Sequence, residues 1–195
     1  MYSTLNYDLL FEAAALRLGL KTIYEDRKNR GCARFLKIHG SSNFWPDCSA
    51  TMFQGCTFTE GVKADVSIRI RPLNQEETIR RCLTDDSLAP ARSIYAQGKA
   101  VRITPTYVEN QRSMWLRSVN RARKIFVTGV RVHPADQHIW GPLGQCKADF
   151  LYFGFPSDRE EFLSWKDEAR KGNAFFHEAD FSHCISIIRR QRNRV

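Results

Sequence analysis

The stretches TLNYD, residues 4–8, and LKIHGS, residues 36–41, decide how the fold is read. Each begins as a short apolar segment that ends abruptly at polar side chains. This pattern is typical of the carboxyl end of a strand in a parallel sheet, where open α/β folds bind their ligands. The two stretches therefore predict an α/β protein in which two strand ends meet at a ligand-binding crevice.

The polar residues at these strand ends bring together three different functional groups. Asn6 provides an amide, Asp8 a carboxylate, and His39 an imidazole that can accept a proton near neutral pH. The neighbouring Gly40 allows a close backbone approach. Each group also has a structural alternative, because Asn and Asp commonly cap helices and a histidine after an apolar run is often hydrogen-bonded in a core. Their occurrence together favours a functional site.

The chain as a whole alternates between strand-like and helix-like segments. Short apolar or alternating runs predict strands, and apolar residues at helical spacing predict helices. We expect strands at residues 2–5, 35–38, 66–70, 100–103, 124–128, 149–153 and 174–177, and helices at residues 7–18, 73–83, around Trp115, after the capping sequence 157–160, and at 181–190. Residues 21–34 are expected to be mainly loop, and residues 42–64 to cover the crevice as a loop or a small subdomain. This order predicts a Rossmann-like parallel sheet with flanking helices, in a single domain over residues 1–195.

The order of the motifs resembles that of a known family. Asn6-Tyr-Asp8 comes first, followed by Lys37-Ile-His39-Gly40-Ser41, Ile103-Thr-Pro105-Thr-Tyr, Trp115 and FVTGVRVHPAD at residues 126–136. In this order they resemble the later part of a SIR2-like domain, of the divergent sirtuin relatives that include many NAD-consuming enzymes. The resemblance implies NAD as the substrate and a hydrolase of the NAD glycohydrolase type.

The resemblance also implies roles for three residues. In the family, the asparagine that matches Asn6 lies beside the nicotinamide ribose, and the carboxylate that matches Asp8 lies near the nicotinamide amide. The histidine that matches His39 is the base that works on the ribose hydroxyls. Cleavage of the glycosidic bond develops positive charge on the ribose, so nearby acceptors and a base lower the barrier. We therefore expect Asn6, Asp8 and His39 to be catalytic, with Asn6 and Asp8 also contacting NAD.

A second group of residues follows the strand expected at 124–128. Gly129 matches the glycine that lets the adenosine side of NAD approach the backbone, and Asp136 keeps the family's spacing after it. Val130 and Arg131 stand where a small or hydroxylated residue is commoner in the family. The resemblance thus implies an NAD contact at Gly129, Val130, Arg131 and Asp136. Within this group, Val130 and Arg131 differ from the residue types that are common in the family.

One family feature has no counterpart in the chain. SIR2-like domains open with a Gly-rich turn that holds the pyrophosphate at a helix N-terminus. None of the eleven glycines of this chain forms G-x-G. We therefore expect an N-terminally truncated copy of the domain, which is incomplete in its phosphate-binding part, inactive as an isolated chain, and complemented by an N-terminal segment or by another protein chain.

Composition leaves two alternatives to the enzyme. The formal net charge is +9, which attracts polyanions and makes a nucleic-acid-binding protein one alternative. A non-catalytic interaction module that pairs its sheet edge with another chain is the other.

The six cysteines form no C-x-x-C, so no metal site is predicted. No apolar run approaches the length of a membrane span and no secretory signal is readable, so we expect a cytoplasmic protein without membrane contact.

Overall fold

The computed structural model describes residues 1–25, 29–48, 64–66, 68–84, 90–91, 101–103, 105–169 and 171–192. The chain divides into two compact units, Met1–Trp115 and Leu116–Val195, here called unit 1 and unit 2. The boundary falls within the long helix α3 (Pro105–Arg121). The prediction that one domain covers both units stays a prediction, and each unit is described by itself.

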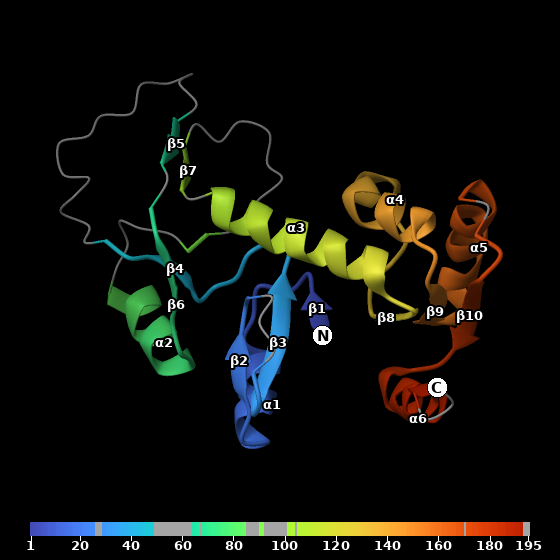
Figure 1. Ribbon diagram of the computed structural model, residues 1–195, viewed down its shortest axis with the longest axis horizontal. Coiled ribbons are helices and arrows are strands. Elements are labelled where there is room, and N and C mark those ends of the chain that lie inside the picture. The colour runs from blue at the N-terminus through green and yellow to red at the C-terminus, as the bar shows by residue number, and fades with distance from the viewer. Residues whose placement is uncertain are drawn as a thin grey trace. The chain divides into compact units, whose positions relative to one another are not determined.

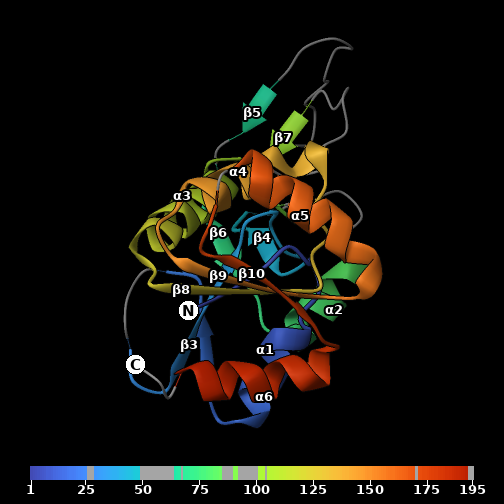
Figure 2. The ribbon, with the colours of Figure 1, turned by 90° about the vertical axis from the view of Figure 1, so that its right-hand side faces the viewer.

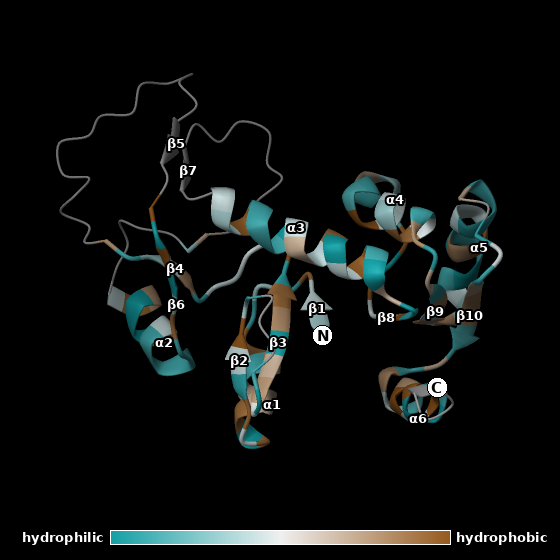
Figure 3. Cartoon of the chain, viewed as in Figure 1, coloured by the Kyte–Doolittle hydropathy of each residue, from teal (hydrophilic) through white to brown (hydrophobic). Residues whose placement is uncertain are grey.

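The main sheet of unit 1 has three parallel strands in the order β1-β3-β2, which are Tyr2–Thr4, Cys32–Lys37 and Lys21–Ile23. The central strand β3 is largely apolar (Figure 3) and its last residues are buried, which places them in the core of this unit. Because the strands are parallel, their carboxyl ends lie at one edge of the sheet. Helix α1 (Leu10–Arg17) connects β1 to β2 (Figure 1).

Helix α1 follows from its own sequence. LFEAAALR consists almost entirely of strong helix formers, and Gly19 follows it with a φ of 71°, the left-handed conformation that commonly ends helices. The helix was expected over residues 7–18 but begins at Leu10. The Asp8 carboxylate accepts the backbone N–H of Leu10 at 3.1 Å, so Asp8 precedes the helix rather than forming its first turn.

Unit 1 also contains two smaller strand pairs and two helices. One pair is antiparallel and the other is parallel. The elements are β4 (Phe44–Pro46) paired with β6 (Ile70–Pro72), β5 (Ala64–Val66) paired with β7 (Val101–Ile103), α2 (Gln75–Thr84), and the part of α3 up to Trp115.

Unit 2 is a second parallel sheet, in the order β10-β9-β8. Its strands are β8 (Lys124–Thr128), β9 (Asp149–Gly154) and β10 (Ala174–Glu178), and short 3-10 turns cover Pro134–Asp136 and Pro156–Asp158. Helices α4 (Gln137–Gln145) and α5 (Arg159–Glu168) lie on one face, and α6 (Phe181–Arg192) lies on the other (Figure 2).

The alternation of side chains along β9 explains these layers. Phe150 and Tyr152 contact aromatic rings of α4 and α5, whereas Leu151 and Phe153 cluster with Cys184 of α6. Since successive residues of a strand point to opposite faces, the apolar run Phe150–Phe153 of β9 must be covered on both faces. Strand β9 therefore forms the centre of unit 2.

The predicted fold class is confirmed: the protein is mixed α/β, with parallel sheets flanked by helices as in a Rossmann-like fold. Three details of the prediction are wrong. Residues 21–34 are not loop throughout, because β2 and the start of β3 lie there. Residues 66–70 are not one strand, since β5 ends at Val66 and β6 begins at Ile70. The strands flanking α3 do not share a sheet, because β7 pairs with β5 and β8 with β9.

Among the helices described, none is both long and apolar enough to cross a membrane.

Candidate functional site

The candidate site lies at the carboxyl edge of the unit 1 sheet, where β1 and β3 end. The last paired residues of these strands are Thr4 and Lys37. Asn6 and His39 each lie two residues beyond these paired residues. Both therefore follow strand ends at the same edge of the sheet. Asn6 is exposed and His39 is half-buried. This is the arrangement expected for residues that line a crevice at strand ends.

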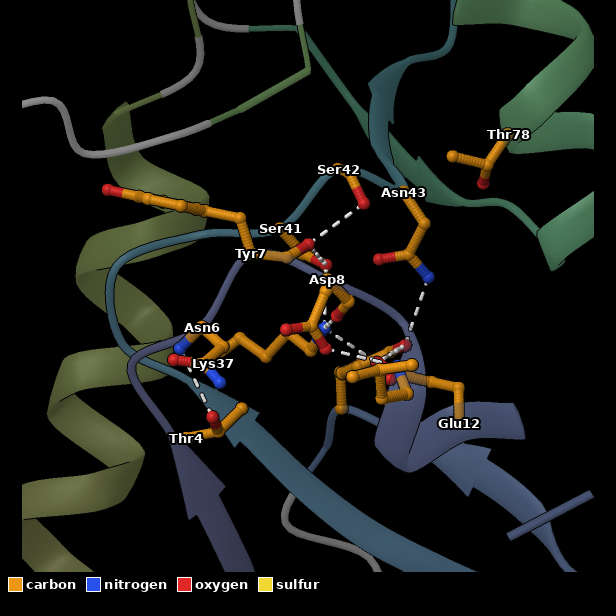
Figure 4. Close-up of polar contacts among 12 residues, drawn as sticks. Thr4, Asn6, Tyr7, Asp8, Glu12, Lys37, Ser41, Ser42, Asn43 and Thr78 are labelled. Carbon is orange, nitrogen blue, oxygen red and sulfur yellow. Dashed lines mark hydrogen bonds and ion pairs between the residues drawn. The ribbon is translucent and has the colours of Figure 1, made fainter. Parts of the chain in front are cut away.

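The two motif segments are joined by hydrogen bonds just beyond these strand ends (Figure 4). The carbonyl oxygen of Tyr7 accepts the backbone N–H of Ser42 at 2.9 Å and the Ser42 hydroxyl at 2.8 Å. The Ser41 hydroxyl donates to the same oxygen at 3.4 Å. The segments containing Asn6 and His39 therefore lie against each other, although more than thirty residues of chain separate them.

Asp8 has a structural role in addition to its predicted one. Its carboxylate accepts the N–H of Leu10 in the turn that leads into α1, where Leu9 is the N-cap residue, and its side chain is exposed. A carboxylate has two oxygens and about four acceptor positions, so one helix contact leaves capacity for a ligand. The contact of Asp8 with nicotinamide stays a prediction.

The most heavily bonded residue of the site is Lys37, which has no exposed surface. Its ammonium group lies 2.9 Å from Glu12 Oε1 and 3.0 Å from the Ser41 hydroxyl, and it donates to the backbone carbonyl of Asp8 (Figure 4). Lys37 thus contacts both motif segments and the helix that follows the first of them.

The Lys37 contacts extend into a buried polar network. The Tyr24 hydroxyl donates to Glu12 Oε1 at 2.7 Å and accepts from the Asn43 amide at 3.0 Å. Gln111 of α3 accepts the backbone N–H of Lys37 and donates to the Tyr24 carbonyl at 2.8 Å. Sequence reasoning missed this network. Its one local signal is a charged lysine inside the otherwise apolar run at residues 35–38.

Burial raises the pKa of two tyrosines in unit 1. The pKa of Tyr24 is raised first by burial and then by the neighbouring Glu12 carboxylate. The pKa of Tyr107 is raised to about 12, again mainly by burial, with a smaller effect from Glu25. Both phenols therefore stay neutral in the folded chain at pH values where a free tyrosine ionises.

This difference predicts that unit 1 loses stability at high pH. A phenol with a higher pKa in the folded than in the unfolded chain favours folding below the unfolded pKa, about 10, and loses that contribution as pH rises through the folded pKa. We expect the free energy of unfolding to fall between about pH 10 and the folded pKa of Tyr107, about 12. Urea denaturation across this range measures the free energy of unfolding.

Phenolate absorbance in Glu12→Gln should show Tyr24 ionising at a lower pH than in the parent chain, because the neighbouring carboxylate charge is gone. An unchanged Tyr24 midpoint would contradict this effect of Glu12.

A cleft of about 750 Å³ borders the polar network. Its walls come from α1, β2 and β6, and its lining includes Glu12, Tyr24 and Asn43 from the network and the exposed Arg69. Among the described residues, buried Glu12 Oε2 and Asn43 Oδ1 have no hydrogen-bond partner. The residues Asn6, Asp8 and His39 do not line this cleft.

The predicted adenosine-side residues lie in unit 2, at the carboxyl end of β8. Gly129 is exposed and has a φ of 68°, a conformation that favours glycine, and Val130 is half-buried. The Arg131 guanidinium donates to both carboxylate oxygens of Glu161, with the Nε contact at 2.7 Å. These hydrogen bonds lower the pKa of Glu161. Asp136 is half-buried at the end of a 3-10 turn.

This placement separates the two predicted groups by unit. Asn6, Asp8 and His39 lie at the carboxyl edge of the unit 1 sheet, whereas Gly129, Val130, Arg131 and Asp136 follow a strand of the unit 2 sheet. Both groups follow parallel strands, as predicted from the sequence. Arg131 already has a carboxylate partner, so an adenosine contact at this position stays a prediction.

In the part of the chain that the structure describes, no three His, Cys, Asp or Glu side chains form a group that could hold a metal ion. Comparison with other proteins adds no further assignment. No protein-family model, curated protein or solved structure matches this chain. The SIR2-like relationship is therefore a prediction that depends on the motifs.

Proposed function

We propose that this chain provides the nicotinamide-ribose side of a SIR2-like NAD-binding site, belonging to an NAD glycohydrolase. The observation that carries the proposal is the meeting of the two motif segments at one sheet edge. The Tyr7 carbonyl binds Ser42, and Asn6 and His39 follow paired strand residues at the same level. Two motifs that resemble the same family thus lie against each other where an α/β fold binds ligands.

The proposed chemistry uses the Asn6 amide, the His39 imidazole and the Asp8 carboxylate. In NAD hydrolysis the bond between the nicotinamide nitrogen and the ribose breaks, nicotinamide leaves, and water adds to the ribose carbon. The Asn6 amide orients the attacking water, and the His39 imidazole accepts a proton from it or from a ribose hydroxyl. The Asp8 carboxylate accepts an N–H from the nicotinamide amide. Each role matches the hydrogen-bonding capacity of the residue that performs it.

The proposal includes a partner for phosphate binding. Since the 195 residues contain no G-x-G, the pyrophosphate contacts are assigned to a complementing segment or to another chain. We therefore expect the chain alone to bind NAD without releasing nicotinamide.

Calorimetric titration with NAD tests the site. We expect His39→Ala and Asn6→Ala each to weaken binding about tenfold, which corresponds to roughly 1.4 kcal/mol. His183→Ala is the matched control, because His183 is an exposed histidine of α6 in the other unit, and its affinity should equal that of the parent chain. Absence of binding at millimolar NAD, or equal affinity in His39→Ala, would contradict the proposal. Release of nicotinamide that His39→Ala abolishes would support the site and overturn the expected inactivity.

A second candidate function is nucleic-acid binding, which the net charge of +9 favours, together with the exposed Arg189 and Arg190 of α6. If it is correct, affinity for a DNA or RNA duplex should fall steeply between 50 and 200 mM salt, by roughly 10³-fold or more for about six phosphate contacts. Fluorescence polarisation measures this dependence. Affinity that is independent of salt would exclude binding through phosphate contacts.

A further inference from the structure

Lys37 is placed where an ordinary strand residue would be apolar. It is the last paired residue of the central strand β3, it follows the buried Phe35 and Leu36, and its own side chain has no exposed surface. Burying a charged side chain costs several kcal/mol unless it is paired and hydrogen-bonded. Lys37 meets this requirement completely, because the three donors of its ammonium group have three acceptors.

The three acceptors belong to three different pieces of chain. They are the Glu12 carboxylate of α1, the Ser41 hydroxyl after β3, and the backbone carbonyl of Asp8 after β1. The Glu12 contact balances the charge. The other two contacts tie the segment that carries Asn6 and Asp8 to the segment that carries His39.

We infer that Lys37 is a positioning residue, whose ammonium group fixes the Asn6–Asp8 segment against the His39–Ser42 segment. The NAD-binding consequence rests on the proposed function, whereas the positioning itself does not. Because Lys37 is buried beneath the sheet edge, it acts through the backbone of Asp8 and through Ser41 rather than by touching a ligand. A buried ion pair can often be replaced by neutral groups at little cost in stability, so stability alone does not require a lysine here.

The ammonium geometry also distinguishes lysine from arginine. Lysine presents three donors from a single atom on a flexible stem, whereas arginine presents a flat fork of five donors. The acceptors of Glu12, Ser41 and Asp8 surround a single point, which suits the lysine ammonium group. An arginine at position 37 would therefore keep the positive charge without keeping all three contacts.

The decisive variant is the double substitution Glu12→Gln with Lys37→Met, which removes both charges and leaves neither unpaired. Its matched control is Arg71→Gln with Glu77→Gln, because this ion pair of unit 1, between an exposed arginine and a half-buried glutamate, includes no residue of either motif segment. Three quantities are compared with the parent chain: the free energy of unfolding, the exchange rate of the Ser42 amide that bonds to Tyr7, and the NAD affinity. The carbonyl resonance of Asp8 reports directly on the lysine contact.

We expect the double variant to fold, to exchange its Ser42 amide at least tenfold faster, and to bind NAD about tenfold more weakly, with the Asp8 carbonyl resonance shifted. The control pair should change none of these. A folded double variant with parent-like Ser42 exchange and an unshifted Asp8 resonance would overturn the inference and leave Lys37 with a stabilising role only. If the parent chain does not bind NAD, the proposed function fails, while the exchange rate and the resonance still decide the positioning role.

Ser41→Ala covers the case in which the double variant does not fold. This substitution removes one of the three acceptors together with the 3.4 Å bond from the Ser41 hydroxyl to the Tyr7 carbonyl, and it keeps the ion pair between Lys37 and Glu12. We expect it to shift the Asp8 carbonyl resonance and to raise the exchange rate of the Ser42 amide about threefold. No change in either quantity would overturn the inference.

Discussion

Glu12→Ala is expected to lower the free energy of unfolding by about 3–5 kcal/mol, the usual cost of removing one partner of a buried ion pair. Lys37 is fully buried, and the Glu12 side chain is only 12% exposed. Removing the carboxylate leaves the ammonium charge inside the protein and also takes the acceptor from the Tyr24 hydroxyl. Both losses act on the same network, so their effects combine.

Urea denaturation of the two chains measures the Glu12 effect. The control is Glu109→Ala, because Glu109 is an exposed acidic residue of α3, and substitutions at such positions usually change stability by no more than about 0.5 kcal/mol. Glu12→Gln should be milder than Glu12→Ala, since the amide oxygen can still accept from Lys37 and Tyr24. A loss below about 1 kcal/mol in Glu12→Ala would show that the ammonium group of Lys37 does not depend on the carboxylate.

Elements with strong local patterns could be predicted from the sequence. The strand expected at residues 124–128 coincides with β8, and the helix expected at 181–190 lies within α6. In both cases the apolar spacing over the segment itself specifies the structure. Strand β2 could not be predicted in this way, because its three residues, Lys-Thr-Ile, carry too little pattern and are held by pairing with β3.

The same distinction applies to the candidate site. Asn6 and His39 could be singled out because polar residues follow short apolar segments, and the structure places them at the same sheet edge. The contacts of Gln111 with Lys37 and Tyr24 span 74 and 87 residues of sequence, so no local pattern could reveal them. The position of Arg131 after β8 was predictable, whereas its pairing with Glu161 depends on how α5 packs beside it. Contacts between residues far apart in the sequence therefore determine the parts of the site that local sequence patterns do not predict.

Phe150→Ala is expected to cost unit 2 about 3–5 kcal/mol, because removing a fully buried aromatic side chain leaves a cavity that the surrounding residues fill only in part. Phe150 has no exposed surface and lies on the central strand β9, where its ring contacts Trp140, Phe162 and Trp165. Those three rings come from α4 and α5, so the substitution weakens the packing of both helices on the sheet.

The matched control for Phe150→Ala is Phe175→Ala, on the neighbouring strand β10, because this ring is 50% exposed and its removal leaves no enclosed cavity. We expect the control to cost less than about 1 kcal/mol. Urea denaturation gives both values, and hydrogen exchange of peptides from residues 124–178 locates the change in unit 2. Equal losses for the two variants would mean that the aromatic cluster around β9 is not the core of this unit, and that its sheet is held mainly by backbone pairing among β8, β9 and β10.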